Sequence, residues 1–89
     1  MDGFICPVDV ISVCNADGQI RPIRLQLYGA QQNIIRMDIE EILSIKDIPY
    51  IGVEASIFIC RAKTADHRMI IELKYVFRSH TWFLIRRLY

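Results

Sequence analysis

The chain has 89 residues, 53% of them hydrophobic, with 11 basic and 10 acidic side chains and a formal net charge of +1. This length predicts a single domain, residues 1–89, and no run approaches the ~20 apolar residues of a membrane-spanning helix. A domain this small buries only about 60% of its extended surface, so some of its many apolar side chains are expected to face a partner.

The first seven residues, Met1–Pro7, carry neither the basic region nor the apolar stretch of a secretory signal. The three cysteines, Cys6, Cys14 and Cys60, are odd in number and form no Cys-x-x-Cys pattern. Such a set fits a reducing compartment better than a disulfide framework, so a cytoplasmic location is expected.

The N-terminal third predicts a β-hairpin. Residues 8–15 are rich in β-branched side chains and lead into Asp17-Gly18, a pair that favours a type I′ turn because glycine adopts positive φ without strain. Pro22 cannot donate a ladder hydrogen bond, so the returning strand, residues 19–28, is expected to begin at a sheet edge or to carry a bulge near its start. Its buried face is expected to consist of Ile23, Leu25 and Leu27.

The middle of the chain combines two patterns. Residues 34–38 alternate, with Ile35 and Met37 inward, as in a strand. An aspartate followed three residues later by a glutamate then resembles a helix-capping box, and apolar side chains at positions 39, 42 and 43 have helical spacing. One short helical or 3-10 turn is therefore predicted near Asp38–Ile42, before residues 43–48 resume as a strand.

Three further strands are predicted in the C-terminal half, over residues 53–62, 69–78 and 81–88. The last two would form a hairpin with Ser79-His80 as a two-residue turn. The resulting cross-strand pairs are Phe77 with Trp82, Tyr75 with Leu84, Ile71 with Leu88 and Glu72 with Arg87. The first three pairs form an apolar face that must be core, and the last is a favourable charge pair on the other face.

Six or seven short antiparallel strands in sequence order predict an all-β fold. Such a meander closes most economically as a small barrel or a two-layer sandwich, because closure removes exposed sheet edges. In this pattern of strands the chain resembles small SH3-like barrels. A half-open sheet completed across a dimer is the alternative architecture.

No motif indicates an active site, a cofactor or a metal ion. His67 and His80 fall in predicted turns, no phosphate-binding glycine loop or Gly-x-Ser-x-Gly elbow occurs, and the cysteines and histidines lack zinc-site spacing. The chain is therefore interpreted as non-catalytic, with no cofactor and no metal. An enzyme would need a cavity that holds one of the histidines near a carboxylate.

The leading interpretation is a binding or assembly module that forms a homodimer. The outer face of the C-terminal hairpin carries more apolar surface than a sheet face leaves in water. The residues expected at this interface are Val76, Phe83, Ile85 and Tyr89.

The alternative interpretation is a nucleic-acid-binding barrel. Residues 1–50 carry seven acidic and four basic side chains, whereas residues 51–89 carry three acidic and seven basic. Small β-barrels bind nucleic acid by stacking bases on aromatic side chains beside a basic groove, although a net charge of +1 is low for this role. The phosphate-binding residues in this alternative are Lys74, Arg78, Arg86 and Arg87.

Overall fold

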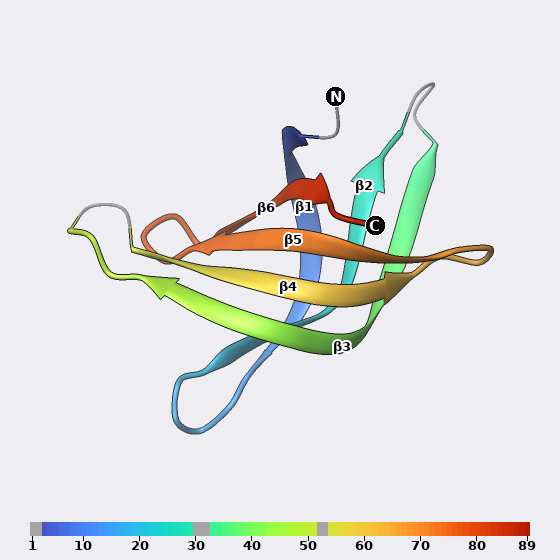
Figure 1. Ribbon diagram of the computed structural model, residues 1–89. Coiled ribbons are helices and arrows are strands. Elements are labelled where there is room, and N and C mark those ends of the chain that lie inside the picture. The colour runs from blue at the N-terminus through green and yellow to red at the C-terminus, as the bar shows by residue number, and fades with distance from the viewer. Residues whose placement is uncertain (1–2, 30–32, 52–53) are drawn as a thin grey trace.

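The computed structural model describes residues 3–29, 33–51 and 54–89. Its strands are β1 (Gly3–Cys14), β2 (Ile20–Tyr28), β3 (Ile34–Ile48), β4 (Ala55–Lys63), β5 (Arg68–Val76) and β6 (Thr81–Arg87). Each strand is antiparallel to the next, and β6 returns to pair with β1, so the sheet closes as a six-stranded barrel (Figure 1). The predicted all-β meander barrel is confirmed, and the half-open sheet is wrong because the β1–β6 pairing closes it.

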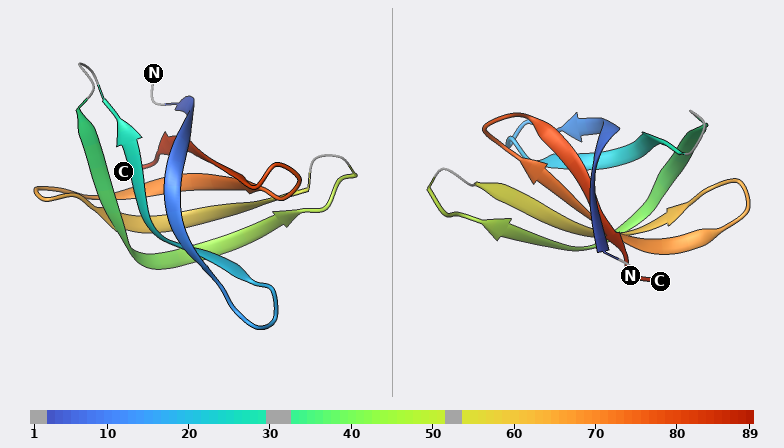
Figure 2. Two further views of the ribbon diagram at one scale, coloured as in Figure 1. Left: turned by 180° about the vertical axis from the view of Figure 1, so that it is seen from behind. Right: turned by 90° about the horizontal axis from the view of Figure 1, so that it is seen from above.

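The strands of the barrel face one another in two layers. In Figure 1, β1 and β2 cross behind β4, β5 and β6, and the view from above in Figure 2 shows the two layers. β3 bends and belongs to both, since its first residues pair with β2 and the remainder with β4. The described segments contain no helix, and so none that is long and apolar enough to cross a membrane.

The barrel interior is built from alternate residues, because successive side chains of a strand point to opposite faces. In β4 and β5 every second residue from Phe58 to Ala62 and from Met69 to Tyr75 is buried. The core cluster consists of Leu25, Met37, Phe58, Cys60, Ala62, Met69, Ile71, Leu73, Tyr75, Trp82 and Leu84.

The predicted β1–β2 hairpin is confirmed, but its turn is not of type I′. A type I′ turn needs positive φ at both central residues. Of residues 15–19, all of them described, only Gly18 has positive φ, at 82°. The Asn15 carbonyl accepts from the N–H of Gly18 at 3.0 Å, and the Asn15 side chain accepts from the backbone N–H groups of Asp17 and Gln19. The asparagine side chain therefore organises a longer, three-residue loop.

Pro22 lies beside a bulge in β2, as its missing N–H predicts. Ile11 of β1 faces Arg24 while the next residue, Ser12, faces Pro22, so Ile23 is an extra residue. The bulge places Ile23 outward, where it is 46% exposed, while Pro22 beside it is buried. The expectation that Ile23 is buried is wrong for this reason.

The helical turn predicted near Asp38–Ile42 is wrong, because β3 continues as a strand through these residues. Two bulges interrupt its pairing with β4, one between Ile39 and Glu41 and one between Ile42 and Ser44. A bulge adds one residue between two inward positions and so changes a spacing of two into a spacing of three. Ile39 and Ile42 both pack against the core, and their separation therefore imitates helical periodicity within a bent strand.

The β5–β6 hairpin has a four-residue turn, Phe77–His80, instead of the predicted pair Ser79-His80. Tyr75 therefore faces Trp82, a position that the sequence pattern assigned to Phe77. A shift of two residues keeps each side chain on the same face of the sheet, so Tyr75 and Trp82 both lie on the buried face, as predicted. Phe77 moves past the end of the strand and is 41% exposed.

Candidate interaction surface

The outward side of β4, β5 and β6 carries six apolar side chains among charged ones. These apolar side chains alternate with the buried core residues, and each is partly buried by its cross-strand neighbours. Phe83 faces Lys74 on β5, and Lys74 faces Ile57 on β4, so one row of contacts crosses all three strands. We define this surface, the C-terminal face, by the residues Ile57, Ile59, Ile70, Glu72, Lys74, Val76, Phe83 and Ile85.

Three of the four predicted interface residues lie together on the C-terminal face. Val76 pairs with Thr81 at one end of the β5–β6 hairpin, and Phe83 follows on the neighbouring strand. Tyr89 lies beyond the end of β6, where its carbonyl accepts from the N–H of Ile70 at 3.0 Å and its side chain is 82% exposed. The structure therefore groups Val76 and Phe83 with Ile85 and leaves Tyr89 at the margin.

Ile85 lies at a bulge on this surface. Leu73 faces Leu84 while the preceding residue, Glu72, faces Arg86, so Ile85 is an extra residue in β6. The four-residue turn alone would set Glu72 opposite Ile85, and the bulge moves the position opposite Glu72 to Arg86, so the predicted partner Arg87 is wrong. Their ion pair has an Nε–Oε1 distance of 2.7 Å.

The isoleucines of β4 complete the surface, and the sequence did not identify them as part of it. In the sequence Ile57 and Ile59 alternate with Phe58 and Cys60. Both sets are apolar, so their alternation does not indicate which side points outward. The pairing of Ile57 with Lys74 and of Ile59 with Glu72 decides it.

The four cations of the nucleic-acid alternative do not form one cluster. Lys74 lies within the C-terminal face, and no described carboxylate forms an ion pair with it. Arg86 is paired with Glu72, and Arg87 Nε donates to the Tyr89 carbonyl at 3.0 Å. The fourth, in the β5–β6 turn, is Arg78. Two aromatic side chains of the same hairpin, Tyr75 and Trp82, are each only 7% exposed and so offer bases little surface for stacking.

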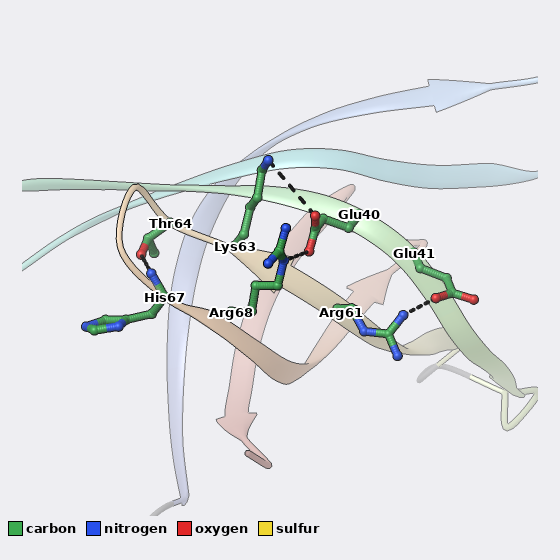
Figure 3. A network of polar contacts seen from close by, with 7 residues as sticks. All are labelled: Glu40, Glu41, Arg61, Lys63, Thr64, His67 and Arg68. Atoms are coloured by element: carbon green, nitrogen blue, oxygen red, sulfur yellow. Dashed lines mark hydrogen bonds and ion pairs between the residues drawn. The ribbon is translucent and has the colours of Figure 1, made fainter.

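Acidic side chains of the first half of the chain pair with basic ones of the second half. Glu40, the extra residue of the first β3 bulge, accepts from Arg68 Nε at 3.0 Å, and Lys63 Nζ lies 4.0 Å from its other oxygen (Figure 3). Arg61 forms an ion pair with Glu41 on the strand opposite. The charge asymmetry along the sequence is therefore largely cancelled on this part of the surface.

The two histidines lie in different surroundings. His67 lines an open cleft of about 820 Å³ between the start of β3 and the β4–β5 turn, together with Arg36 and Asp38. His80 Nδ1 lies 3.0 Å from the Tyr75 hydroxyl. Within the described residues, neither imidazole is hydrogen-bonded to a carboxylate. The described contacts of the two histidines therefore do not form a catalytic triad of nucleophile, base and acid.

The three cysteines are free thiols with different exposure: Cys14 is exposed, Cys6 half-buried and Cys60 fully buried. Burial raises the pKa of the Cys60 thiol from its ordinary value of 9.0 to about 12, because the core disfavours the thiolate. In the part of the chain that the structure describes, no three Cys, His, Asp or Glu side chains are grouped so as to hold a metal ion.

Comparisons of this chain with models of protein families, with curated proteins and with solved structures find no match. The interaction surface is therefore interpreted from its own residues.

Proposed function

We propose that this chain is a small non-catalytic assembly module that pairs with a second copy of itself through the C-terminal face. The observation that carries the proposal is the group of six partly exposed apolar side chains on the outward side of three adjacent strands. Apolar groups gathered on a sheet face are typical of interaction sites, because water tolerates such patches poorly. The three free cysteines support a reducing setting, and the cytoplasm is the proposed location.

A second copy fits this face because its charges are self-complementary. Glu72 and Lys74 are two residues apart on β5 and therefore point to the same side. In a twofold-symmetric pair with its axis between them, Lys74 of each copy approaches Glu72 of the other. Lys74, which has no carboxylate partner among the described residues of one copy, gains one in the dimer, where Glu72 is shared with Arg86.

The test is the oligomeric state of Phe83→Glu, which places a charge at the centre of the C-terminal face. We expect the wild-type chain to sediment at twice the monomer mass in the micromolar range and the variant as a folded monomer. The dimer dissociation constant should rise at least about thirtyfold, as at a central interface position. Ile11→Glu is the matched control, because Ile11 is 60% exposed on β1, outside this face. A wild type that stays monomeric at high micromolar concentration refutes the proposal.

Nucleic-acid binding through Lys74, Arg78, Arg86 and Arg87 is the competing proposal. It is supported by the ammonium of Lys74 beside Phe83, which pairs with no carboxylate in the part of the chain that the structure describes. It requires an affinity for mixed-sequence single-stranded DNA or RNA that falls steeply as salt rises, because phosphate contacts release counterions. Absence of binding at low salt removes this alternative.

A further inference from the structure

The second half of β3 has a sheet neighbour on one side only. β2 pairs with β3 from Ile34 to Asp38, and β4 pairs with it from Asp38 to Ile48. The first residues of β2 pair instead with β1, in the hairpin that projects past β3 in Figure 1. Within the described residues, no strand therefore lies along the β2-facing edge of β3 after Asp38.

The last part of this edge is regular. The two bulges end at Ser44, and from Ser44 to Ile48 five successive residues pair with β4 without a break. Alternate N–H and C=O groups of such a strand point to the open side, where they form a template for one more strand. The chemistry that satisfies them is the backbone of an extended peptide.

A cleft on the inner side of this edge can receive a side chain of the added strand. It has a volume of about 200 Å³, and its lining combines the apolar side chains of Ile20, Phe58 and Phe77 with Gln19 and Arg21 of the β1–β2 hairpin. Ile45, which points toward it from β3, is 44% exposed. An apolar side chain opposite Ile45 would cover this surface.

The carboxylate of Asp47 determines which charge is favoured on the residue of the added strand that lies opposite it. Asp47 lines the same cleft and accepts from the Ser56 hydroxyl at 2.6 Å, and Ser56 is itself only 4% exposed. The carboxylate is thus held in place. Arg21 lines the same cleft, but no described cation lies within ion-pair distance of Asp47. A lysine or arginine opposite Asp47 supplies a direct cross-strand charge partner, and an acidic residue suits the position opposite Lys46 on the outer side.

The same charges disfavour a second copy at this edge. In a twofold antiparallel pair of β3 edges, a register centred on Lys46 sets two lysines opposite each other. A register centred on Asp47 sets two carboxylates opposite each other. Like charges in directly opposed positions destabilise a sheet. A register centred on Ile45 opposes no like charges, so these charges disfavour two of the registers and favour a partner with the complementary order of charges.

We propose that the free edge Ser44–Ile48 of β3 binds an extended segment of a partner protein as an added antiparallel strand. That segment carries an apolar residue opposite Ile45, a basic residue opposite Asp47 and an acidic residue opposite Lys46. This surface is separate from the C-terminal face, and the proposal does not depend on self-association.

The probe is a fluorescent peptide of sequence Thr-Val-Lys-Glu-Val-Thr, which places its lysine opposite Asp47 and its second valine opposite Ile45. We expect it to bind and to shift the backbone amide resonances of residues 44–48. The peptide with Glu and Lys exchanged should bind at least about tenfold more weakly, because both charge pairs become repulsive. Asp47→Lys combined with Lys46→Glu should reverse the preference, whereas Asp9→Lys on β1 should leave it unchanged.

Three outcomes overturn the proposal. They are no binding of the first peptide up to millimolar concentration, equal binding of both peptides, and a dimer that Ile45→Lys dissociates without any peptide effect. Sedimentation of the same samples reports self-association through the C-terminal face separately, so failure of one proposal is distinguished from failure of the other.

Discussion

Truncation of Phe77 to alanine measures the register of the β5–β6 hairpin directly. In the structure Phe77 is 41% exposed, and it contacts Tyr75 edge-to-face with ring centroids 5.2 Å apart. Burying a whole phenylalanine side chain is worth about 1.5–3 kcal/mol, and the space that Phe77 vacates opens to solvent instead of forming a closed cavity. We therefore expect Phe77→Ala to lower the free energy of unfolding by about 1–2 kcal/mol.

The matched variant is Phe58→Ala. Phe58 is 1% exposed and lies 5.5 Å from Trp82 between ring centroids, so its removal leaves a core cavity and should cost about 3–5 kcal/mol. A chain of this length has a total stability of roughly 4–13 kcal/mol, so this variant should be marginal while Phe77→Ala stays folded.

Urea denaturation followed by the fluorescence of Trp82, the single tryptophan, gives both values at one fixed protein concentration, since association also stabilises. The two-residue turn indicated by the sequence pattern would place Phe77 in the core opposite Trp82. A loss of 3 kcal/mol or more for Phe77→Ala, on the order of a buried aromatic residue, would contradict the four-residue turn.

Two further predictions concern the thiols and the first turn. At pH 8 a disulfide reagent should label Cys14 in the native protein and leave Cys60 unmodified until unfolding. Between pH 9 and about 12 the Cys60 thiol ionises in the unfolded chain but not in the folded one, so the free energy of unfolding should fall with pH by about 1.4 kcal/mol per unit. In the Cys60→Ala variant the free energy of unfolding should not show this fall with pH. Equal slopes in the variant and the wild type would refute the raised pKa of the Cys60 thiol. Gly18→Ala should lower the free energy of unfolding, measured by urea denaturation, by about 1 kcal/mol, because Gly18 has a φ of 82° that alanine adopts only with strain. No atom lies within 4 Å of a Cβ at this position, so the backbone conformation alone accounts for the loss. An unchanged free energy of unfolding would contradict this prediction.

The strands were predictable because their signal is local. Alternation in residues 53–62 and 69–78 and the Asp17-Gly18 turn depend on a few neighbouring side chains, and β4, β5 and the first hairpin formed as expected. Pro22 also indicated its bulge, since the missing N–H of proline is a property of one residue.

The errors occurred where local patterns were ambiguous. The spacing of Ile39 and Ile42 fits either a helical turn or a strand with a bulge, and only the pairing of β3 with β4 identifies the bulge. The C-terminal hairpin alternates equally well with a two-residue or a four-residue turn, because a shift of two residues keeps every side chain on its face. The placement of Phe77 was therefore open until the strands were paired.

The sequence by itself determined the fold class, the sidedness of β5 and β6 and the high apolar content. The tertiary structure decided the closure through β1 and β6, the outward side of β4, the bulge that places Ile23 outward, and the edge of β3 that β2 leaves open. The physical reason is distance along the chain: Pro7 pairs with Phe83, and no pattern within either segment specifies a partner so remote in sequence.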